Sequence, residues 1–120
     1  MASQVLSGGN TQTFTYTNNT GQNVRIVINF CSIQTSVNYG TMSWAGVNLS
    51  LPFNSSCSFG RNLAYSYTST GHGNNMYFPT TTGGAIPTEL MIANGQSFAI
   101  NANTGGNIYA YNIVVIPENG

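Results

Sequence analysis

The sequence predicts an all-β fold, an antiparallel β-sandwich that is jelly-roll-like and has about eight strands. Apolar and polar residues alternate over most of the chain, which is the period of a strand with one buried face. Turn signals rich in Asn and Gly recur about every eight to twelve residues, the spacing typical of sandwiches and barrels. No window of helical length carries apolar residues at the spacing of a helix face between capping residues.

The clearest local pattern is a predicted hairpin over residues 11–31. Aromatic residues alternate with threonines over 11–17, and every second residue is apolar over 24–31. Between them, 18–21 is a turn cluster in which Asn or Gly can take positive φ. The predicted core face of this hairpin carries Phe14, Tyr16, Val24, Ile26, Ile28 and Phe30.

Shorter strands follow along the rest of the chain. Ala45-Gly46 predicts a tight hairpin turn between strands at 41–44 and 47–51. The last strand ends in the apolar run Ile113–Ile116, which predicts a central strand buried on both faces by the second sheet or by another subunit. The other predicted strands are 63–68, 76–78, 90–93, 97–102 and 108–116, with loops at 69–75 and 79–87 and turns at Asn94-Gly95 and Gly105-Gly106.

The length of 120 residues fits one domain and is too short for two. We expect residues 11–120 to form this single β-sandwich domain. Residues 1–10 contain Ser7-Gly8-Gly9-Asn10 and no clear strand, so we expect a flexible N-terminal arm. Two interpretations of the arm stay open: an extended contact along a neighbouring subunit, or an ordinary frayed terminus.

Charge is almost absent from the chain. Its four charged residues are Arg25, Arg61, Glu89 and Glu118, whereas about a quarter of an ordinary domain is charged. Two arginines cannot neutralise a phosphate backbone, which excludes a nucleic-acid partner. No apolar run approaches the roughly 20 residues of a membrane span, so no membrane association is expected. The first residues lack the pattern of a secretory signal peptide.

The cysteines and the histidine indicate no cofactor and no metal. Without an export signal, Cys31 and Cys57 are expected to be thiols in a reducing cytoplasm, although a disulfide between them stays open. Together with His72 they leave the four-ligand set of structural zinc incomplete. Because no export signal is recognised, the glycosylation acceptor pattern Asn18-Asn19-Thr20 is discounted.

Enzymatic activity is not expected. Glu89 and Glu118 are predicted to be solvated and apart, so they do not form a general acid–base pair. His72 lies between two glycines in a predicted loop, and the chain has no aspartate to orient it.

Two stretches resemble parts of small bacteriophage virion proteins. Residues 16–29 are similar to the early hairpin of phage surface proteins. Residues 93–100, followed by 111–118, are similar to the turn and closing strand of trimeric, tumour-necrosis-factor-like jelly rolls, which recur in phage decoration proteins and tail fibres. Together the stretches cover about a third of the chain. The resemblance implies a non-enzymatic homotrimer with its closing strands near the three-fold axis.

Four residues are candidates for an interface: Arg25, Trp44, Tyr109 and Tyr111. Arg25 lies opposite the predicted core face and either points toward a partner or pairs with Glu118. Trp44 is a core residue, an interface anchor or a carbohydrate platform. The tyrosines offer more amphipathic surface than one small core needs, which favours oligomerisation.

These features together predict a capsid decoration or cement protein that stabilises the shell as a homotrimer. The alternatives are a tail-fibre or tail-tip domain that contacts the host, and a carbohydrate-binding β-sandwich module. The expected partners are other copies of the chain and the major capsid protein or other virion proteins, with a host surface glycan as an alternative. The expected location is the virion, after synthesis in the host cytoplasm.

Overall fold

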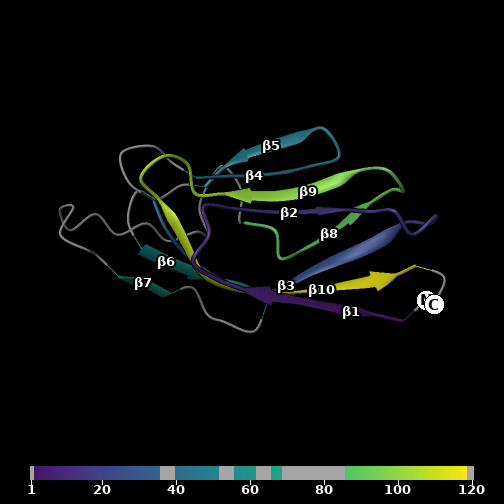
Figure 1. Cartoon of the computed structure of the whole chain (residues 1–120), viewed down its shortest axis with the longest axis horizontal. Helices are drawn as coiled ribbons and strands as arrows, with labels where there is room; N and C mark the ends of the chain where they lie inside the picture. The colour runs from purple at the N-terminus through teal and green to yellow at the C-terminus, as the bar shows by residue number, and fades with distance from the viewer. Residues whose placement is uncertain (1, 36–39, 52–55, 62–65, 69–85, 119–120) are drawn as a thin grey trace.

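The computed structural model describes residues 2–35, 40–51, 56–61, 66–68 and 86–118, and this part of the chain contains strands and no helix. Two antiparallel sheets pack face to face as two layers (Figure 1). The predicted all-β antiparallel sandwich is therefore confirmed.

Sheet A forms the lower layer in Figure 1, and sheet B forms the upper one. Sheet A has the order β1-β10-β3-β6-β7, and β8 pairs with the first part of β3. Its strands are β1 (Gln4–Gly8), β3 (Val24–Gln34), β6 (Ser56–Phe59), β7 (Ser66–Thr68), β8 (Glu89–Ile92) and β10 (Asn107–Pro117). Sheet B has the order β2-β9-β4-β5, with β2 (Thr13–Thr17), β4 (Thr41–Trp44), β5 (Val47–Ser50) and β9 (Ser97–Asn101).

The strands pair in a nested order. β1 pairs with β10, β2 with β9, β3 with both β6 and β8, and β4 with β5. This is the pairing of a long folded hairpin wrapped into two sheets, which is the jelly-roll arrangement. Because the pairing is nested, the chain repeatedly crosses from one sheet to the other between consecutive strands.

That crossing makes the predicted hairpin over 11–31 wrong. Both of its strands exist, but β2 lies in sheet B and β3 in sheet A. The turn cluster between them is present, with Gly21 at φ 84°, yet it connects the two layers instead of two neighbours. The other predicted hairpin is confirmed: β4 pairs with β5 across Ala45 and Gly46, whose φ angles of 46° and 81° give the two left-handed positions of a tight turn.

The prediction of a flexible arm over residues 1–10 is also wrong for most of that segment. Gln4–Gly8 form β1, which pairs along its whole length with β10. The backbone N–H and C=O groups of β10 that face away from β3 need hydrogen-bond partners, and β1 supplies them. Leu6 of β1 also packs partly against the core. Gly8 lies under the Tyr111 ring: a Cβ there would come within 2.7 Å of the Tyr111 hydroxyl oxygen.

Other predicted elements differ in smaller ways. β6 was not predicted, because serines occupy every second position of this short strand. β7 covers only the last part of the strand predicted at 63–68. The strand predicted at 76–78, the loop at 69–75 and most of the loop at 79–87 lie outside the described residues.

The core is aliphatic with a few aromatic rings. Fully buried side chains come from both sheets and fill the space between them, each contributing about 1.5–3 kcal/mol of transfer free energy. The largest are Phe59, Phe98, Ile26, Ile28, Ile33, Met42, Leu51, Ile92, Ile100, Ile108 and Ile113.

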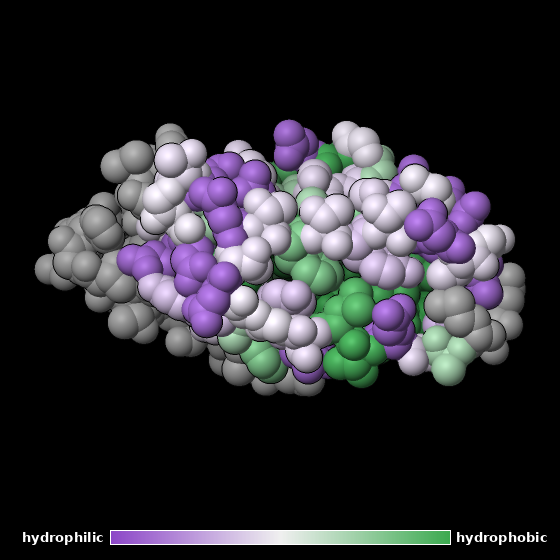
Figure 2. Space-filling model, in the orientation of Figure 1, coloured by the Kyte–Doolittle hydropathy of each residue, from purple (hydrophilic) through white to green (hydrophobic). Residues whose placement is uncertain are grey.

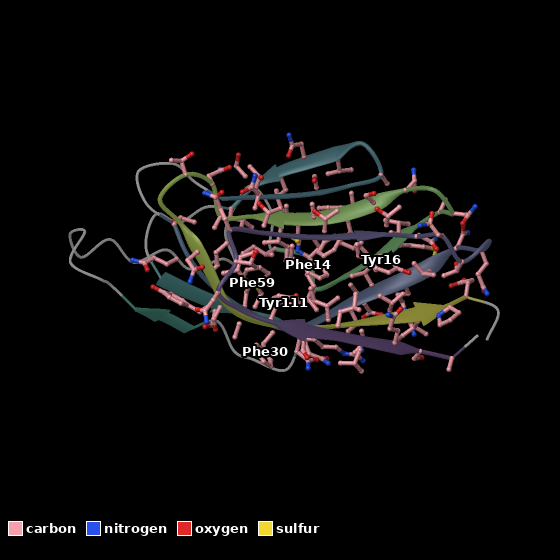
Figure 3. The ribbon with its side chains drawn as sticks, in the orientation of Figure 1. Phe14, Tyr16, Phe30, Phe59 and Tyr111 are labelled. Atoms are coloured by element: carbon pink, nitrogen blue, oxygen red, sulfur yellow. The ribbon has the colours of Figure 1, made fainter. Side chains whose placement is uncertain are left out.

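The pairing of β3 with β10 contains two bulges. Asn29 has no opposite residue between the pairs Ile28–Ile113 and Phe30–Asn112, and its amide donates to the Asn112 side chain at 2.8 Å. An extra residue reverses the alternation of a strand. Phe30 therefore lies on the outer side of sheet A, away from the other labelled rings (Figure 3), and its predicted place on the core face is wrong. Cys31 takes the inner position and is buried. The side chain of Cys57 is not among those described.

Asn18 is a fully buried polar residue at the end of β2. Its side-chain nitrogen donates to the carbonyl oxygens of Gln22 at 2.8 Å and Ile92 at 3.3 Å. Its side-chain oxygen accepts from the Thr20 hydroxyl at 2.7 Å, and its backbone N–H donates to Gln96. Asn18 thus joins the β2–β3 crossing to the β8–β9 turn, and its burial leaves no room for a glycan.

We predict that Asn18→Ala lowers the free energy of unfolding by about 2–4 kcal/mol, because buried backbone carbonyls and the Thr20 hydroxyl would lose their partner. Asn19→Ala, at the exposed neighbouring position, is the control and should change it by less than about 0.5 kcal/mol. Urea unfolding followed by fluorescence measures both. Equal stability of the two variants would contradict the role assigned to Asn18.

Candidate interaction surface

The charged residues of the chain are segregated on one sheet. Arg25 lies in β3 and Glu89 in β8, while Arg61 is the second residue after β6 and Glu118 directly follows β10. All four therefore lie in sheet A or within two residues of the end of one of its strands. Since the chain has no other charged residue, the outer face of sheet B is uncharged.

The outer face of sheet A carries an apolar strip. Along each strand, inward-facing core residues alternate with outward-facing ones. Val24 and Ile26 of β3 point inward, so Arg25 and Val27 point outward. Strand register then places outward residues in two rows across β1, β10, β3 and β8. One row is Val5, Val114, Val27 and Glu89, and the other is Ile116, Arg25 and Met91. We call these two rows together the sheet A strip, which has five apolar members and the two charged residues Arg25 and Glu89.

The sheet A strip is open to solvent at its two margins, whereas Val27 at its centre is only 2% exposed. Val5 is 61% exposed and Met91 is 45% exposed, whereas Val114 and Ile116 are half-buried. Figure 2 shows hydrophobic surface on the lower layer of the sandwich, on the side where β1 is the edge strand in Figure 1. Exposed apolar side chains on the outer face of a sheet are candidates for a contact, so we take the two exposed margins of the strip, Val5 and Met91, as the candidate surface.

An ion pair lies within the sheet A strip. Arg25 Nη1 is 3.3 Å from Glu89 Oε1, with the two side chains 47% and 42% exposed. The expected pairing of Arg25 with Glu118 is therefore replaced by pairing with Glu89, the diagonal neighbour across the β3–β8 ladder. In a single chain in water a pair this exposed adds little stability.

The other predicted interface residues do not join Arg25. Trp44 is half-buried and packs against the core from β4, and Tyr111 also packs against the core. Tyr109 is 46% exposed at the opposite end of β10, where its hydroxyl donates to the Gln34 side chain. Of the four candidates, Arg25 is the one within the sheet A strip. The apolar run Ile113–Ile116 predicted that this strand is apolar on both faces, but no sequence signal pointed to Val5 or Met91.

An aromatic seam lies between the edge strands β1 and β2. Phe14 and Tyr111 have ring centroids 4.6 Å apart (Figure 3), and Tyr16 packs beside them, half-buried. Tyr111 also covers Gly8, its partner on the edge strand β1 of the same sheet, so the seam closes this side of the sandwich. Burial raises the pKa of the Tyr16 hydroxyl above its ordinary value of about 10, because the phenolate loses solvation there.

The outer face of sheet B is built from small uncharged side chains. Thr13, Thr15 and Thr17 face outward from β2, and the neighbouring outward positions of β9, β4 and β5 are Ser, Thr, Asn and Ala. Cross-strand hydrogen bonds join them, such as Thr17 Oγ1 to Ser97 Oγ at 2.8 Å. This face is hydrated through hydroxyl and amide groups, and its contacts depend little on ionic strength.

The described residues contain no group of three or more His, Cys, Asp or Glu side chains able to hold a metal ion. Glu89 is engaged with Arg25, and Glu118 follows the far end of β10. His72 lies outside the described residues. Within the same part of the chain, no helix is long and apolar enough to cross a membrane.

No protein-family model, curated protein or solved structure matches the chain. The arrangement of the outer faces therefore provides the argument about function.

We predict that Tyr16→Phe flattens the alkaline limb of the stability curve. Below about pH 10 the hydroxyl is protonated in both states, so it adds no pH dependence. As the pH rises further, the unfolded chain loses this proton first, and the free energy of unfolding of the unmodified protein falls. Urea unfolding at about pH 8 and about pH 11 should show a smaller loss for Tyr16→Phe. The same loss in both proteins would contradict the burial effect.

Proposed function

We propose that this chain is a non-enzymatic structural protein of a phage particle, a capsid decoration or cement protein that acts as a homotrimer. The observation that carries the proposal is the sheet A strip, in which outward apolar residues surround the Arg25–Glu89 ion pair on the outer side of the sandwich. Copies that cover this strip with one another would remove exposed apolar side chains from water.

The mechanism is burial across several subunits. A protein that binds only the assembled shell stabilises that state by mass action, in proportion to the logarithm of its concentration over its dissociation constant. The two outer faces suit this role, because one is apolar and the other is uncharged and hydrated. Contacts of both kinds tolerate variable salt better than a charged interface does.

A tail-fibre or tail-tip location is the alternative for the same self-association. The carbohydrate-binding alternative has less support, because Trp44 packs against the core from its strand end. Imaging of purified particles separates the locations: the proposal expects the protein on the capsid shell. Its absence from the shell would contradict the capsid role.

We predict a solution mass of about three times 12.7 kDa by light scattering. The combined variant Val5→Asn and Met91→Gln should shift this mass toward the single chain, because it places polar groups on the sheet A strip. Val47→Asn is the matched control: Val47 is 46% exposed, but it lies on β5 of sheet B.

The control variant should keep the mass of the unmodified protein. A single-chain mass for the unmodified protein, or equal effects of the two changes, would contradict assembly through sheet A.

A further inference from the structure

We infer that the Arg25–Glu89 pair lies inside the contact between copies of the chain and selects a second copy as the partner. This inference rests on the proposed self-association. It adds that the ion pair fixes how the two copies align with each other. Arg25 and Glu89 are flanked by Ile116, Met91, Val114 and Val27 in the two outward rows. A partner that covers the apolar residues must also cover the charges.

Covering one of these charges alone would be costly. A charge taken out of water is tolerated only when an opposite charge and hydrogen bonds compensate it. The strip supplies one cation and one anion, so its own net charge is zero. A strongly acidic or basic partner would leave one of the two groups unmatched. A second copy brings one charge of each sign and can match both.

The position of the pair also fits a closed assembly. Where β8 pairs with β3, the sheet order is β1-β10-β3-β8, so Glu89 stands on a margin strand and Arg25 one strand further in. In a ring with cyclic symmetry, each copy presents the same two groups to its neighbours. Arginines and glutamates then alternate around the contact, and every charge has an opposite neighbour whatever the number of copies.

Burial changes what the pair contributes. The pair is exposed in the single chain, where solvent screens it and its contribution is small. Between two apolar surfaces screening falls, and a wrong register would place like charges together or leave a charge against Val or Met. The ion pair therefore selects one alignment of the two copies among several that the apolar residues alone would permit.

Charge reversal tests this inference on the full chain. Arg25→Glu and Glu89→Arg should each raise the dissociation constant of the assembly at least tenfold, because like charges would meet in the contact. The double variant, with both changes, restores one charge of each sign and should recover most of the association. Arg61→Glu and Glu118→Arg are matched controls that change the net charge equally outside the strip. Sedimentation velocity over a concentration series measures all five variants.

Thermal unfolding of each variant at a concentration below association should stay close to that of the unmodified protein, which shows that the fold is intact. Single variants that associate as tightly as the controls would overturn the inference, although assembly of the unmodified protein would still stand. A double variant that remains dissociated would also overturn it, since a contact with a second copy must recover when both signs are exchanged. A failure of the unmodified protein to associate contradicts the proposed function itself.

Discussion

The long antiparallel pairing between β3 and β10 is the constraint on which the rest of the structure depends. Each strand has eleven residues, and among the described strands β1 pairs with β10 while β6 and β8 pair with β3. The two bulges decide which side chains face sheet B and which face outward. The bulge at Asn29 places Cys31 in the core and Phe30 outside. The register of this strand pair thus decides which residues of β3 and β10 meet on the outer face of sheet A.

The local alternation of apolar and polar residues predicted well where strands lie, but it predicted poorly which strands pair with each other. The alternation in 11–17 and 24–31 identified β2 and β3, and Ala45-Gly46 identified the β4–β5 turn, because these signals lie within a few neighbouring residues. The wrong hairpin followed from assuming that consecutive strands pair, whereas nested pairing depends on contacts between distant residues. β1 was missed because a short strand with one core contact at Leu6 is held mainly by the backbone of β10.

The candidate surface was predictable only in part. The run Ile113–Ile116 indicated apolar side chains on both faces of a central strand, and Arg25 was recognised as pointing away from the core. Its partner Glu89 could not be found from the sequence, because β8 meets β3 only in the folded sheet. Val5 and Met91 join the same strip by register alone. With its charges gathered on sheet A and its sheet B face uncharged, the molecule has two chemically different sides, which suits a building block that contacts its own copies on one side.

Oxidation of Met91 tests most directly whether another copy covers the sheet A strip. Met91 is 45% exposed in the single chain, and Met42 is fully buried and serves as the internal reference. Hydrogen peroxide oxidises accessible thioethers, and peptide mass spectrometry reports each site separately. The account predicts that Met91 reacts nearly as slowly as Met42 at concentrations where the solution mass is that of a trimer, and much faster after dilution to single chains. Rapid oxidation of Met91 in the intact trimer would contradict it.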